Sequence, residues 1–128
     1  MTWYGASLIF ATKVIGEEQV KFPISEEVYL VGAPDDETAW RLAEEIGRDD
    51  ALVNDTIEFN GRIASREFLG IRKLRSIYNP VSMDDIDQEI PTHGSEITRS
   101  NFEVVGQERL DALMAGKSVT VEYLDGAI

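Results

Sequence analysis

The chain has 128 residues, of which 24 are acidic and 12 are basic, so its formal net charge is −12. This negative field would repel a phosphate backbone, which argues against nucleic-acid binding. The absence of cysteine excludes a disulfide framework, a thiol nucleophile and any cysteine-ligated metal centre.

The first third of the sequence predicts two strands. Residues 3–15 carry apolar side chains on both faces of an alternating pattern, which indicates a central strand. Residues 26–32 alternate in the same way and predict a second strand. A short extended piece over residues 20–24 precedes it, and we expect Pro23 to interrupt that piece.

The clearest helix of the sequence lies between Pro34 and Gly47. Asp35 or Asp36 can accept hydrogen bonds from the free N–H groups of its first turn. Gly47 is suited to end it, because glycine adopts a left-handed conformation at no steric cost. The helix would carry one narrow apolar stripe, formed by Ala39, Leu42, Ala43 and Ile46.

The middle of the chain predicts a β-hairpin with a long second arm. Asn60-Gly61 lies between two β-rich runs, and both residues tolerate the positive φ angles of a type I′ turn. The returning arm runs to Tyr78, which is long for one strand. We therefore expect a bulge or bend at Gly70.

The last part of the chain predicts an acidic loop, a strand, a helix and a final strand. The loop covers residues 79–95, the strand 97–105, the helix 106–115 and the last strand 117–124. The expected fold class is therefore α+β, with a mainly antiparallel sheet of about five to six strands and two helices packed on one face. Residues 1–128 have the usual length of a single domain.

The expected location is the cytoplasm, and no membrane contact is expected. The opening Met1-Thr2-Trp3-Tyr4 lacks the basic region of a secretory leader. No apolar run approaches the roughly 20 residues of a membrane-spanning helix. The lack of cysteine also fits a reducing compartment.

The sequence offers no catalytic constellation. Its one histidine, His93, falls in the acidic loop, where a solvated side chain is the usual case. Paired acids such as Glu26-Glu27 are interpreted as surface residues, although an enzyme with a carboxylate-based site stays an alternative. We expect a protein that is not an enzyme and has no cofactor.

Four acids of the loop region have the spacing of calcium ligands in an EF-hand. Ile90, however, occupies the position where the sharp turn of that motif needs glycine, so no metal site is expected. The four acids are Asp85, Asp87, Glu89 and Glu96.

The hairpin arm is the exception to the acidic composition, because five of the 12 bases fall between residues 62 and 75. If the register holds, Arg62, Arg66 and Arg72 share one face and could hold an anion or an acidic partner. The alternative is that they neutralise the neighbouring acids. Trp40 flanks the helical stripe and could contribute to an interface. The candidate ligand-binding or partner-binding residues are Arg66, Arg72, Arg75 and Trp40.

The opening Trp3-Tyr4-Gly5-Ala6-Ser7-Leu8-Ile9-Phe10 resembles the start of the bacterial domain-of-unknown-function family four-two-eight-eight. Residues 26–31 and 36–43 are similar to the next strand and helix of that family. Phe68-Leu69-Gly70-Ile71 is similar to its Phe-hydrophobic-Gly-hydrophobic segment. The resemblance covers about residues 3–78. It implies no activity, because the family has none known.

Three functions remain open at this level. The first hypothesis is a non-enzymatic interaction protein, such as an immunity-type partner that covers a basic protein surface. The second is a domain that binds a small anionic ligand through the arginine-rich arm, and the third is an enzyme. A homodimer is also expected, because two helices leave part of the sheet or helix surface uncovered.

Overall fold

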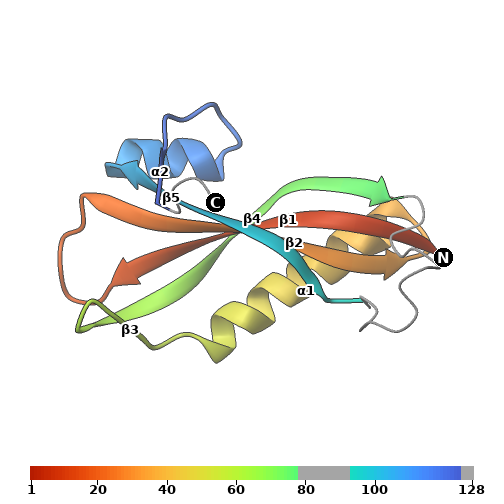
Figure 1. The fold of residues 1–128 in the computed structure, drawn as a ribbon, viewed down its shortest axis with the longest axis horizontal. Coiled ribbons are helices and arrows are strands. Elements are labelled where there is room, and N and C mark those ends of the chain that lie inside the picture. The colour runs from red at the N-terminus through yellow and green to blue at the C-terminus, as the bar shows by residue number, and fades with distance from the viewer. Residues whose placement is uncertain (78–92, 125–128) are drawn as a thin grey trace.

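The computed structural model describes residues 1–77 and 93–124, and it has an α+β fold (Figure 1). Six strands form one antiparallel sheet in the order β3-β4-β1-β2-β5-β6. The predicted order of elements and the antiparallel sheet are confirmed. The elements are β1 (Thr2–Val14), β2 (Lys21–Ala33), α1 (Asp36–Val53), β3 (Ile57–Phe59), β4 (Arg62–Ile77), β5 (Glu96–Val105), α2 (Gln107–Met114) and β6 (Glu122–Tyr123).

The two helices cover opposite faces of the sheet, so the expectation that both pack on one face is wrong (Figure 1). Successive side chains of β1 point to opposite faces. Leu8 and Phe10 pack in the core beneath α1, whereas Ile9 and Ala11 pack in the core beneath α2. A strand that is apolar on both faces needs cover on both, and this is the physical reason for the arrangement.

Helix α1 begins as predicted but continues past its expected end. Asp35 is its N-cap, and its Oδ1 accepts a hydrogen bond from the backbone N–H of Thr38 at 2.7 Å. The helix runs through Gly47 to Val53. Gly47 is buried inside the helix against β4 and does not terminate it, because the lack of a side chain there serves close packing.

Strand β2 is also longer than expected. It begins at Lys21 and includes Pro23, so Pro23 does not interrupt it. The β1–β2 pairing ends at Ala11 and Ile24, so Pro23 lies just beyond that ladder and pairs only with Glu103 of β5 among the described residues. A missing N–H is tolerated in that position. The final strand is shorter than expected: among the residues that the structure describes, only Glu122 and Tyr123 pair with β5.

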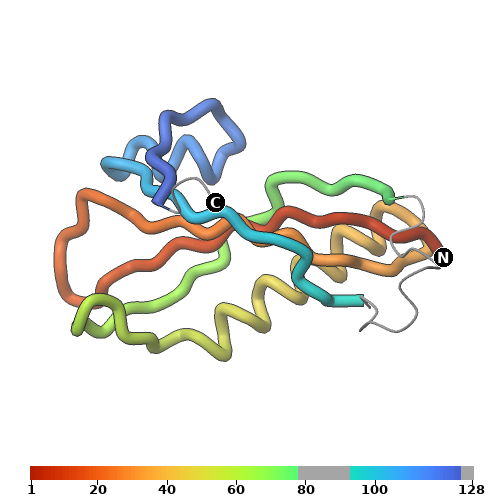
Figure 2. Tube along the Cα trace, viewed as in Figure 1, coloured from red at the N-terminus to blue at the C-terminus, as the bar shows by residue number. Residues whose placement is uncertain are grey.

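The hairpin and the bend in its long arm are confirmed. Asn60 and Gly61 have φ angles of 51° and 78°, as a type I′ turn requires. Gly70 has a φ of 139°, and the β1–β4 register shifts on either side of Leu8-Ile9. Figure 2 shows the β3–β4 turn and the β1–β2 turn at the same end of the sheet. There Ile15 N–H donates to the Ile63 carbonyl at 2.9 Å.

Most of the predicted acidic loop lies outside the described residues, and so do Asp85, Asp87 and Glu89. The described part of the chain contains no helix that is long and apolar enough to cross a membrane.

Candidate anion-binding site

A buried carboxylate, Glu27 of β2, lies at the centre of the sheet face that α1 partly covers. Its side chain is 1% exposed, so its interpretation as a surface residue is wrong. Alternation along β2 places Glu27 on the same face as Tyr29 and Val31. Its neighbour Glu26 therefore points to the opposite face.

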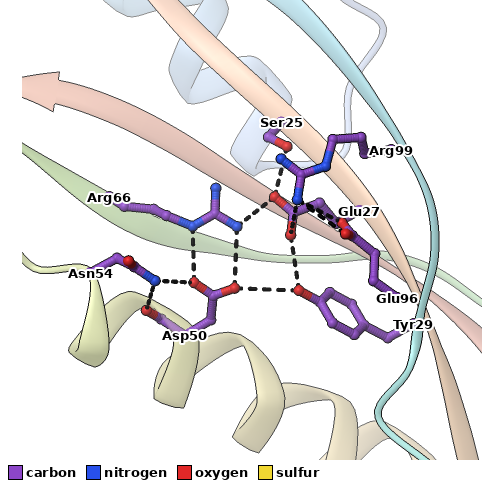
Figure 3. A network of polar contacts seen from close by, with 8 residues as sticks. All are labelled: Ser25, Glu27, Tyr29, Asp50, Asn54, Arg66, Glu96 and Arg99. Carbon is purple, nitrogen blue, oxygen red and sulfur yellow. Dashed lines mark hydrogen bonds and ion pairs between the residues drawn. The ribbon is translucent and has the colours of Figure 1, made fainter. Parts of the chain in front are cut away.

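Both carboxylate oxygens of Glu27 are engaged (Figure 3). Oε2 accepts hydrogen bonds from Ser25 Oγ at 2.7 Å and from Arg66 Nη2 at 2.5 Å. Oε1 accepts one from the Tyr29 hydroxyl at 2.9 Å and lies 3.6 Å from Arg99 Nη2. These partners offset the large desolvation cost of a buried charge.

The guanidinium of Arg66 is held from two further sides. Its Nε donates to Asp50 Oδ1 at 3.0 Å, and its Nη2 lies 3.3 Å from Asp50 Oδ2. Its Cζ lies 3.8 Å from the centre of the Phe10 ring, a cation–π contact. Asp50 is itself fixed by Asn54, whose Nδ2 donates to Oδ1 at 2.8 Å. Arg66 is thus a preoriented cation that links β4, β2 and α1.

The network shifts the protonation equilibria of its members. Burial alone would raise the pKa of Glu27, but hydrogen bonds from Arg66, Ser25 and Tyr29 outweigh it and hold the pKa below its ordinary value of 4.5. Burial and the neighbouring Glu27 carboxylate raise the pKa of the Tyr29 hydroxyl. At neutral pH Glu27 is therefore an ion, Tyr29 is a neutral donor and Arg66 is a cation.

A cavity of about 270 Å³ opens beside this network. Arg66 and Arg99 line it together with the polar residues Thr12, Ser25 and Asn101. None of the described residues that line it is acidic. In Figure 3, Nη1 of Arg66 points away from Asp50, and it makes no hydrogen bond to any described residue. We refer to this cavity as the Arg66–Arg99 pocket.

Strand pairing explains how distant residues come together at this pocket. In the β2–β5 ladder Glu27 pairs directly with Arg99, and in the β1–β4 ladder Thr12 pairs with Arg66. Arg66 is one of the site residues predicted from the sequence, whereas Arg99 and Glu27 are not among them. Glu27 lies on the inward face of β2 and faces a base, Arg99, across the β2–β5 pairing. This pairing of opposite charges is the signal that identifies the two residues.

Arg72 lies on the opposite face from Arg66, so the expectation of a common arginine stripe is wrong. Its Nη1 donates to the two carboxylate oxygens of Glu26 at 2.8 and 3.0 Å, on the face covered by α2. The register shifts around Gly70 move this part of β4 out of phase with Arg66. Arg62 forms a separate ion pair with Glu17 at 2.7 Å.

The other candidates also lie apart from the Arg66–Arg99 pocket. Arg75 lines a different surface cavity with Tyr4 and Asp36, near the start of α1. Trp40 is 44% exposed on α1. The Nδ1 atom of His93 accepts a hydrogen bond from the backbone N–H of Gly32 at 3.0 Å. The structure thus brings only Arg66, of the predicted set, into this pocket.

Comparisons with known proteins identify the family alone. No curated protein and no solved structure matches the chain. The family model described as "Domain of unknown function (DUF4288)" matches residues 3–98. This match confirms the resemblance seen in the opening strand and in the Phe68–Ile71 segment, and the chain belongs to the DUF4288 family.

Proposed function

We propose that this protein is a non-enzymatic binding domain whose ligand is a small oxyanion held in the Arg66–Arg99 pocket. One observation carries the proposal. The Arg66 guanidinium is fixed through Nε and Nη2, while Nη1 is left without a partner among the described residues. A second guanidinium, that of Arg99, lines the same cavity.

Preorganisation favours anion binding here. Arg66 is ordered by the fold, so a ligand would not have to immobilise it. Guanidinium donors match the geometry of phosphate, sulfate and carboxylate groups. The net charge of −12 opposes this over long distances. At physiological salt the repulsion from charges beyond about 8 Å is screened. Closer in, Glu27, Asp50 and Glu96 pair with the two arginines, so the pocket attracts an anion through the hydrogen-bond donors that these pairs leave unused and not through an excess of positive charge.

The pocket suits a compact ligand. The neutral side chains of Thr12, Ser25 and Asn101 add polar groups at its wall, while Phe59 and Leu124 add apolar surface. A volume of about 270 Å³ fits a free oxyanion or the anionic end of a small organic molecule. The class we propose is therefore a single phosphate, sulfate or carboxylate group.

Binding is better supported than catalysis. A general acid at neutral pH needs a carboxyl group with a raised pKa. The pKa of Glu27 is lowered, and both of its oxygens are engaged. The buried acid next to the pocket is thus suited to orient Arg66 and poorly suited to transfer a proton.

Titration with inorganic phosphate, followed by the amide resonances of Thr12, Ser25 and Asn101, tests this proposal. We expect saturable shifts at those residues. Arg99→Gln should weaken binding about tenfold or more, the usual effect of losing a charged hydrogen bond. Arg99 is half exposed, so its replacement should leave the fold intact.

Arg109→Gln is the matched control, because it removes the same charge from α2, a helix on the other face. It should bind phosphate like the parent protein. Sulfate and acetate arms would show which oxyanion geometry is preferred. Equal weakening of phosphate binding by both variants would mean that the net charge of the protein, and not the pocket, determines binding. An absence of saturable shifts with all three anions would refute the proposal.

A second candidate function is the binding of a basic protein partner, and one observation favours it. Glu103 and Glu122 lie directly opposite each other in the β5–β6 pair, and neither forms an ion pair within the described residues. Like charges at facing positions destabilise a sheet, so a basic partner would relieve them. Binding of a lysine-rich peptide that Glu103→Gln weakens would support this function, and unchanged binding would count against it.

A further inference from the structure

A second cleft lies on the opposite face of the sheet, between β4 and the segment that follows α2. It consists of cavities of about 320 and 290 Å³. Arg72, Leu113, Lys117 and Ser118 line both cavities, so the two adjoin. We refer to the pair as the Arg72–Lys117 cleft. It shares no lining residue with the Arg66–Arg99 pocket and is independent of the function proposed for that pocket.

The cleft combines apolar walls with two cations at its middle. Apolar side chains line both of its ends, so an extended hydrophobic group could lie on either side of the charged centre. Ile9, Leu69 and Met114 line one end, and Phe102, Val119 and Val121 line the other.

The cations retain unused hydrogen-bonding capacity. Arg72 uses only Nη1 in its contact with Glu26, so Nε and Nη2 make no hydrogen bond to the described residues. Lys117 forms no ion pair with any described residue. One carboxylate therefore faces two cations, and the centre of the cleft has a net charge of about +1 in a strongly acidic protein.

We propose that the Arg72–Lys117 cleft binds a small organic carboxylate with a hydrophobic body. The carboxylate would lie between Arg72 and Lys117, since Arg72 is already oriented by Glu26. The hydrophobic body would cover the apolar wall at one end, where removal of apolar surface from water drives binding. Each cavity is close to the lower end of the volumes usual for small-molecule sites.

Octanoate is a suitable probe, because it joins one carboxylate to a flexible apolar chain. We expect saturable binding in calorimetry and shifts of the Leu113, Val119 and Val121 methyl resonances. Octanol, which has a comparable apolar chain but no charge, should bind at least about tenfold more weakly, as expected when charge-assisted contacts are lost. The comparison separates the contribution of the charge from that of apolar burial.

The variant Lys117→Gln should weaken octanoate binding about tenfold while leaving octanol binding unchanged. Its matched control is Lys21→Gln, which removes the same charge from an exposed residue that lines neither cavity. Equal affinity for octanoate and octanol would overturn the proposal, and so would equal effects of the two variants. Absence of saturable octanoate binding would do the same.

Discussion

Gly47 of α1 lies against the Phe68 ring of β4 so closely that a Cβ atom at position 47 would come within 2.5 Å of Phe68 Cδ1. This contact brings the C-terminal half of α1 onto the sheet, where Asp50 meets Arg66. The helix therefore needs glycine here for a tertiary reason, although glycine weakens the helix itself.

Gly47→Ala should lower the free energy of unfolding by about 1–3 kcal/mol, because overpacking the contact outweighs the better helix propensity of alanine. Urea denaturation measures the change. Phe68→Leu in the same chain should recover part of the loss, since it removes the ring that alanine would meet. A single variant as stable as the parent protein would contradict this account of the contact.

The same residues explain what the sequence could predict about α1. Its start was predictable, because Asp35 is a local cap. Its end was not, because the inward face changes from apolar to polar after Ile46. Asp50 and Asn54 continue that face in steps of four and join the buried network. A helix that is predicted from the spacing of apolar residues therefore ends where its inward face becomes polar.

The candidate site was less predictable than the fold. Hydrophobic alternation identified β1 as central, and the Asn60-Gly61 pair identified the hairpin, because both signals are local. The positions of Arg66 and Arg72 depend on register shifts in β4. Gly70 predicts a bend in this strand, but the sequence does not give the pairing register on the two sides of the bend. One shift in phase sends a side chain to the other face. The pairing of Glu27 with Arg99 depends on two strands that are far apart in sequence.

Gly61→Val should destabilise the hairpin by about 1–3 kcal/mol. The φ of 78° at this position strains a β-branched residue, even though a side chain there would meet open space. Thermal melting measures the loss. Asn60→Gly is the matched control, because glycine accepts positive φ freely, and it should melt near the parent protein. Equal melting of all three proteins would contradict the turn assignment.

Self-association is the next prediction. Trp40, Leu52 and Val53 are exposed on α1, and a groove of about 540 Å³ lies between the end of that helix and β4. Apolar contacts should hold or tighten as salt screens the repulsion between two acidic copies. We therefore expect a dimer by sedimentation at moderate salt, weakened by Leu52→Asp. A monomer at both low and moderate salt, at tens of micromolar protein, would contradict this expectation.

Glu27→Gln should lower the free energy of unfolding at neutral pH by about 3 kcal/mol. The amide removes the negative charge beside Arg66 and Arg99, and the cost is large because the site is buried. Glu45→Gln is the control, since it breaks an exposed helical ion pair with Arg41 and should cost less than 1 kcal/mol. Similar losses in the two variants would mean that the buried network adds little stability.

The stability difference between the parent protein and Glu27→Gln should shrink in acid. The pKa of Glu27 in the folded protein lies below 4.5, so as pH falls through 4.5 the unfolded chain takes up a proton that the folded chain does not. The unfolded state then binds more protons, and the stabilisation from Glu27 decreases as pH falls towards the folded pKa. Above about pH 6 the difference should be constant. Other carboxylates titrate in both proteins and largely cancel in the comparison. Urea denaturation of both proteins from neutral pH down to about pH 3 measures this trend. A difference that stays constant or widens in acid would show that the network does not hold Glu27 as an ion.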